Sequence, residues 1–193
     1  IYQAQSAEND SWFSYGIHPW YANLVLDFKE FDKISNHQNC LALGEIGLDK
    51  LKEKKLNKQI EIFTKQIEFS EKLELPIIIH CVKAWNELKQ LKTALTPSQP
   101  WIYHGFGKKN ILRDVLEAGL YVSFGHHLLN EPKLLDAAVD VPLEKIFFET
   151  DEKQIKIEQV YSTFADAKQI TLQELKEIQF ENFKRVFKKW KSG

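Results

Sequence analysis

Short apolar segments alternate with longer amphipathic segments along the whole of this 193-residue chain. The apolar segments have the length of β-strands, and the amphipathic segments repeat apolar residues at the spacing of a helix face. A strand followed by a helix, repeated many times, is typical of parallel strands with helices packed outside them. We therefore predict an α/β fold. The predicted strands are residues 1–4, 12–17, 40–45, 76–81, 101–104, 120–124 and 145–150. The predicted helices are residues 26–35, 56–73, 82–95, 108–118, 132–138, 155–168 and 171–189.

The polar residues at the strand ends distinguish a closed barrel from an open doubly wound sheet. Five predicted strands end in an ionisable residue or run into one, namely His18, Glu45, His80, His104 and Asp151. In a (β/α)8 barrel these ends converge on one mouth, where active sites form, whereas an open sheet spreads them along an edge. We therefore expect a TIM (β/α)8-type barrel with seven visible strands. Because the chain begins at Ile1 and contains no methionine, we expect the first strand to lie upstream of Ile1.

The composition is that of one ordinary globular domain over residues 1–193, with 44% hydrophobic and 27% charged residues. The formal net charge of -1 excludes a global field that would attract DNA or anionic lipid, so a charged substrate must be held locally. No apolar stretch approaches the roughly 20 residues that span a bilayer, so we expect no membrane contact. The two cysteines, Cys40 and Cys81, are expected to be free thiols of a cytoplasmic protein.

Three of the strand-end residues differ from ordinary surface residues. Glu45 ends an apolar strand between two glycines, which leave room for another group to approach. His80 ends the run 76–79, which is apolar enough for a strand covered on both faces. His104 repeats this arrangement after 101–103. Taken singly, a solvated Glu in a turn and core histidines bonded to the backbone remain the alternatives.

Asp151 adds a carboxylate after the apolar run 146–148. Glu149 and Asp151 share strand parity, so both are expected to face the lumen of the barrel, where an uncompensated charge is costly. A cation at the barrel mouth would compensate it. Histidines with carboxylates form a mixed N/O set that suits Zn, Mn, Co or Ni better than Ca.

Five motifs occur in the order and rough spacing of one known family. They are Gly16-Ile17-His18-Pro19, Leu43-Gly44-Glu45-Ile46-Gly47-Leu48-Asp49, Ile78-Ile79-His80-Cys81, Tyr103-His104-Gly105-Phe106 and Glu149-Thr150-Asp151. From about Phe13 to Phe187, the chain resembles the TatD family of metal-dependent hydrolases, the TatD-like DNases. The resemblance implies an amidohydrolase-like TIM barrel, of which this chain would be a short member.

The resemblance also implies an activity and a ligand set. Family members are one- or two-metal phosphodiesterases, so we expect one or two divalent ions, with Zn, Mg and Mn as candidates. The residues that match the family's metal ligands are Glu45, His80, His104 and Asp151. The resemblance implies that Asp151 also helps to activate the hydrolytic water. The chain departs from the family pattern in two places. It has no His-x-His pair before Gly16, and Glu152-Lys153-Gln154 replaces the usual Ala-Pro-aromatic sequence.

Several other residues carry weaker signals. His18 is a candidate for binding the substrate phosphate or a metal, or for a structural turn beside Pro19. Lys83 and Lys108 follow strand ends, where they could contact a phosphate backbone, as could Lys109 and Arg113. His126 and His127 are expected in an exposed loop. Cys81 is expected to be a packed thiol on the face opposite His80.

These observations predict a monomeric metal-dependent hydrolase with weak, local contacts to nucleic acid. The first hypothesis is a phosphodiesterase or deoxyribonuclease that attacks nucleic-acid ends with a metal-activated water. An amidohydrolase-like enzyme acting on a small amide, lactone or phosphoester is an alternative, because activated water attacks those substrates as well. A catalytically silent barrel that serves as a binding protein is the other alternative.

Overall fold

The computed structural model describes residues 11–23, 28–51 and 56–190, without the side chains of Phe28 and Glu30. The chain divides into two compact units. One comprises Ile1–Trp101 with Phe187–Gly193, and the other comprises Ile102–Val186. No helix among the described residues is long and apolar enough to cross a membrane.

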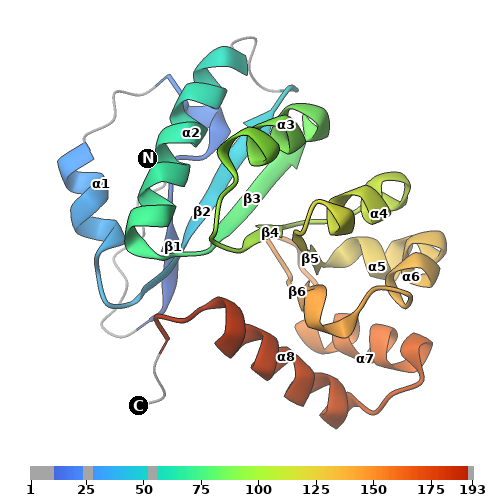
Figure 1. Ribbon diagram of the computed structural model, residues 1–193. Coiled ribbons are helices and arrows are strands. Elements are labelled where there is room, and N and C mark those ends of the chain that lie inside the picture. Colours follow the sequence, from blue (N-terminus) through green and yellow to red (C-terminus); the bar gives the residue numbers. More distant parts are fainter. Residues whose placement is uncertain (1–10, 24–27, 52–55, 191–193) are drawn as a thin grey trace. The chain divides into compact units, whose positions relative to one another are not determined.

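The first unit contains three parallel strands that pair in chain order (Figure 1). They are β1 (Phe13–Tyr15), β2 (Cys40–Asp49) and β3 (Ile77–Val82). Helices α1 and α2 pack against β2, and α3 packs against β3. The helical elements of this unit are η1 (Pro19–Tyr21), α1 (Phe28–Ser35), α2 (Leu56–Leu73) and α3 (Trp85–Leu95).

The second unit also contains three parallel strands. The first of them starts at Trp101, where the first segment of the first unit ends. The three strands are β4 (Trp101–Tyr103), β5 (Tyr121–Phe124) and β6 (Ile146–Phe148). Helices α7 and α8 both contact β6. The helical elements are α4 (Lys109–Glu117), α5 (His126–Asn130), α6 (Pro132–Ala138), η2 (Leu143–Lys145), α7 (Ile157–Lys168) and α8 (Leu172–Val186).

The predicted α/β alternation is confirmed, but the predicted strand number is not. The described residues form six parallel strands, which do not make a complete barrel. The predicted strand 1–4 lies outside the described residues. The last strand also ends earlier than expected, at Phe148 rather than residue 150.

Strands β2 and β3 form the core of the first unit and carry its polar site residues. Along β3 the side chains alternate between buried and half-buried, with Ile77, Ile79 and Cys81 buried and His80 on the other face. All residues of β2 are buried except Glu45, which is half-buried. The two strands approach closely at Gly47, where a Cβ atom would lie 2.1 Å from the His80 carbonyl oxygen. A residue without a side chain is therefore needed beside His80.

Candidate metal centre

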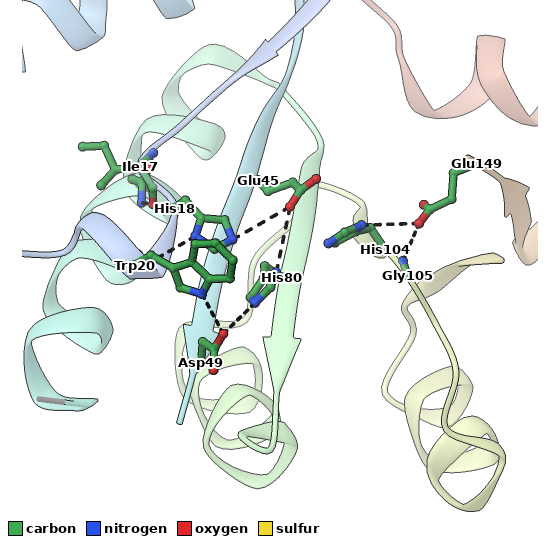
Figure 2. Close-up of polar contacts among 10 residues, drawn as sticks. Ile17, His18, Trp20, Glu45, Asp49, His80, His104, Gly105 and Glu149 are labelled. Atoms are coloured by element: carbon green, nitrogen blue, oxygen red, sulfur yellow. Dashed lines mark hydrogen bonds and ion pairs between the residues drawn. The ribbon is translucent and has the colours of Figure 1, made fainter. Parts of the chain in front are cut away.

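Glu45 lies between two histidines in the first unit. Its Oε2 atom is 3.9 Å from His18 Nε2 and 3.9 Å from His80 Nδ1. One ligand atom from each of the three residues lies within 4.8 Å of the other two, and Figure 2 shows the three side chains turned toward one another. Ligand atoms bonded to one zinc ion at about 2 Å lie roughly 3–4 Å apart, so small side-chain shifts would complete such a site.

Asp49 determines which nitrogen of His80 faces Glu45. Asp49 Oδ2 lies 3.1 Å from His80 Nε2, and the carboxylate is buried, with 2% of its surface exposed. A carboxylate accepts a hydrogen bond from the nitrogen that it faces, so Nε2 carries the proton in the neutral ring. The lone pair of Nδ1 is then directed toward Glu45. This carboxylate–histidine arrangement is the usual support of a metal-binding imidazole.

The Asp49 carboxylate also receives hydrogen bonds from two other donors. Trp20 donates its indole N–H at 2.7 Å (Figure 2). Leu51 donates its backbone N–H at 2.8 Å. Burial alone would raise the pKa of Asp49, but the hydrogen bonds from Trp20, Leu51 and His80 outweigh it and hold the pKa below its usual value. Asp49 is therefore a carboxylate at neutral pH.

His18 presents a donor rather than a lone pair to Glu45. Its Nδ1 accepts the backbone N–H of Trp20 at 3.3 Å, so Nε2 carries the proton in the neutral ring. The His18 ring packs edge-to-face on His80, with 4.3 Å between centroids. In this orientation His18 can donate to a carboxylate or to a phosphate oxygen. To bind a metal through Nε2, it would have to give up the long contact with Trp20.

Two glutamines of α2 hold the backbone around this cluster. Gln66 accepts the Ile17 N–H at 2.6 Å and donates to the Ile17 carbonyl at 3.2 Å. Gln59 accepts the Asp49 N–H at 2.7 Å and donates to the Asp49 carbonyl at 2.9 Å. The sequence interpretation missed both glutamines and also the role of Asp49. The available signal was the seven-residue spacing of two polar residues on the buried face of an amphipathic helix.

In the second unit, His104 contacts Glu149, for which the sequence predicted only that it faces the barrel lumen. Glu149 Oε1 lies 3.4 Å from His104 Nδ1 and accepts the Gly105 N–H at 2.7 Å (Figure 2). Asp151 is exposed in a turn with φ of 50°. The expectation that Glu149 and Asp151 share one strand face is therefore wrong, because β6 ends at Phe148 and period-two alternation ends with it.

The other residues singled out from the sequence lie outside the cluster around Glu45. Lys83 and Lys108 are exposed, the first after β3 and the second at the N-cap of α4. Cys81 is buried on the face of β3 opposite His80, as predicted. His126 and His127 are not in an exposed loop as expected, because they begin α5 and are half-buried. Lys109 starts α4, and Arg113 pairs with Glu117 at 2.7 Å.

The donor set of the first unit fits a transition metal. The His80 imidazole and the Glu45 carboxylate are ligands that zinc and neighbouring divalent metals accept readily, whereas calcium prefers oxygen alone. The hydrogen bond from His80 to the buried Asp49 supplies the outer support that such ligands need. The cluster therefore has the chemistry of a metal centre.

Comparison with known proteins agrees with this chemistry. The model of the TatD related DNase family matches residues 1–188. The chain is 28% identical to the uncharacterized metal-dependent hydrolase YabD of Bacillus subtilis, over 91% of this chain and 78% of the relative. It is 26% identical to the human 3'-5' RNA nuclease TATDN2, over 72% of this chain and 20% of that protein.

A solved structure has the same fold. The TatD homologue YJJV of Escherichia coli superposes with a TM-score of 0.79 and 18% identity, covering 92% of this chain and 76% of that one. The family model covers nearly the whole chain, and YabD bears the name of a metal-dependent hydrolase. The chain therefore belongs to the TatD family of metal-dependent hydrolases.

Proposed function

We propose that this protein is a metal-dependent phosphodiesterase that cleaves nucleic acid near its ends. The observation that carries the proposal is the half-buried Glu45 between His18 and His80, with Asp49 orienting His80. A divalent ion at this position would lower the pKa of a water molecule and offset the charge of a phosphodiester. Membership of the TatD family and the nuclease name of one relative support a nucleic-acid substrate.

Each site residue has a separate role in this proposal. Glu45 and His80 Nδ1 would hold the ion, and the resemblance to the family would add His104 and Asp151 as further ligands. The exposed Asp151 carboxylate accepts the proton of the attacking water. His18 donates a hydrogen bond from Nε2 to a phosphate oxygen, which the hydrogen bond from Trp20 to its Nδ1 favours. Lys83 and Lys108 contact neighbouring phosphates. Residues 1–193 would act as one hydrolase domain.

The test uses the whole chain, stripped of metal with a chelator and reloaded with Zn, Mg or Mn. We expect metal-dependent cleavage of a labelled oligonucleotide and loss of that cleavage in Glu45→Gln. Asp151→Asn should lower the rate by about 10² to 10⁴, the usual contribution of a general base. The matched control is Glu61→Gln on the exposed surface of α2, where the same change removes only ion pairs to Lys58 and Lys65.

A panel of lactones, amides and small phosphoesters separates this proposal from its alternatives. Cleavage of these compounds without cleavage of any oligonucleotide would overturn the nuclease assignment and favour an amidohydrolase-like enzyme. If the metal-loaded protein cleaves nothing, the function is that of a binding protein. Full activity of Glu45→Gln would remove the proposed centre.

A further inference from the structure

The Trp20 side chain is exposed and yet held in one position. It lies in η1, and 44% of its surface is accessible. Its indole N–H donates to the buried carboxylate of Asp49 at 2.7 Å. An indole gains free energy from burial, so leaving one at the surface is unfavourable for the fold. A hydrogen bond to a buried, charged acceptor keeps the ring rigid while much of it stays open to a ligand.

The exposed indole is next to the candidate metal centre. Its ring centroid lies 4.7 Å from that of His18 and 6.1 Å from that of His80. Asp49 binds Trp20 and His80 through the same oxygen atom, which fixes the indole relative to the proposed ligand. The neighbouring Tyr21 is also exposed, with its ring 6.4 Å from the His18 ring. A flat aromatic surface therefore borders the place where the reacting phosphate would bind.

An exposed, rigid aromatic ring beside a phosphate site suits a nucleobase. Bases stack on aromatic side chains with little dependence on sequence, because every base has a flat face. The formal net charge of -1 supplies no general attraction for a polyanion, so stacking can provide affinity that charge does not. Only an unpaired base offers its face to a side chain, which favours a single strand as the substrate.

We propose that Trp20 is the stacking platform for the base next to the phosphodiester that is cleaved. The inference rests on the proposed function, because it names the substrate class of the same site. It makes Trp20 a binding residue and assigns Asp49 a second task, that of fixing the platform. Single-stranded nucleic acid with bases is then preferred over duplex and over a strand without bases.

The experiment compares two labelled single strands that differ by one abasic residue, placed next to the cleaved bond. The metal-loaded whole chain should cleave the strand that carries the base with a kcat/KM roughly 5- to 100-fold higher than that for the abasic strand. This ratio corresponds to the free energy of stacking one base on an aromatic side chain. Trp20→Leu should abolish this preference, and Trp20→Phe should keep part of it, because a smaller ring remains. The control is Trp12→Leu, which alters an indole of similar exposure, 46%, and should keep the full preference.

The preference ratio separates stacking from damage to the metal centre. A Trp20 variant that merely disturbed Asp49 and His80 would lower cleavage of both strands equally and would keep the ratio, and that result would overturn the inference. Equal cleavage of the two strands by the unaltered protein would overturn it as well, while leaving the proposed hydrolase intact.

Binding to the metal-free protein gives a readout that does not depend on hydrolysis. Fluorescence anisotropy with the same two strands should show tighter binding of the strand with the base, and Trp20→Leu should remove the difference. If the protein binds in this way but cleaves neither strand, the platform stands and the proposed function fails. Equal affinity for both strands would count against the platform.

Discussion

One buried carboxylate, Asp49, sets the positions of both His80 and Trp20. It accepts from the two rings through the same oxygen, and Gln59 pairs with its backbone N–H and carbonyl. Its carboxylate contacts the His80 ring, so its effect on a bound ion would pass through His80. Asp49 is accordingly a positioning residue.

Asp49→Asn tests this role at the level of a single residue. The amide keeps the size of the side chain but loses the charge that favours a proton on His80 Nε2. We expect metal affinity to fall by about 10- to 100-fold, as for other outer-shell partners. Isothermal titration of Zn or Mn into the metal-free protein measures the affinity, with Glu61→Gln as the control. Unchanged affinity in a folded variant would show that Asp49 does not orient a ligand.

The residues of the centre differ in how far the sequence predicts them. Glu45 and His80 could be predicted as polar residues that interrupt apolar runs, but they are not strand ends as expected, because β2 continues to Asp49 and β3 to Val82. The pairing of Asp49 with Trp20 could not be predicted, because the two residues are 29 positions apart and meet only in the folded chain. The prediction that Asp151 faces the barrel lumen came from the alternation of side chains along a strand. That prediction was wrong, because β6 ends at Phe148.

At the level of elements, the close approach of β2 and β3 depends on Gly47. Its φ of +145° is a conformation that side chains rarely adopt, and a Cβ atom would lie 2.1 Å from the His80 carbonyl oxygen. Gly47→Ala should therefore lower the free energy of unfolding by more than the roughly 1–3 kcal/mol of backbone strain alone. Urea denaturation monitored by circular dichroism measures the change.

The matched control for this change is Gly119→Ala. Gly119 also has a positive φ, +83°, but a Cβ atom there would meet nothing within 4 Å. This variant isolates the cost of the backbone conformation, so it should be less destabilised than Gly47→Ala. Equal destabilisation of the two variants would mean that the contact with His80 is unimportant.

The end of α2 is tied to the segment before β4 by Glu71. Its carboxylate accepts the backbone N–H groups of Ser98 and Gln99 at 3.1 and 3.0 Å. Partial burial alone would raise the pKa of Glu71, but the hydrogen bonds from Ser98 and Gln99, together with the charge of Lys92, bring it below its usual value.

This lowered pKa predicts a pH dependence of stability with a definite sign. A carboxyl group with a lower pKa in the folded state stabilises the fold above its unfolded pKa, near 4.5, and ceases to do so as pH falls through the folded value. The protein should therefore be more stable than Glu71→Gln at pH 7, and the difference should vanish in acid. Urea unfolding of both proteins between pH 7 and pH 3 measures it. A difference that grows in acid would contradict the assignment.

At the scale of the whole molecule, the order of strands and helices was predictable, and the closure of the barrel was not. The order was predictable because the spacing of apolar residues, which differs between strands and helices, depends only on neighbouring positions in the sequence. Closure depends on strand pairing between distant segments, and the described residues supply six strands in two units. The cytoplasmic location and the monomeric state remain predictions.

The central claim is that Glu45 and His80 bind a metal ion in this protein. Anomalous scattering from crystals of the Zn- or Mn-loaded whole chain, collected on both sides of the metal absorption edge, tests it most directly. We expect a peak bonded to the Glu45 carboxylate and to Nδ1 of His80, with Nε2 of that ring still hydrogen-bonded to Asp49. A fully loaded protein with no peak beside Glu45, or with the metal on other residues, would contradict it.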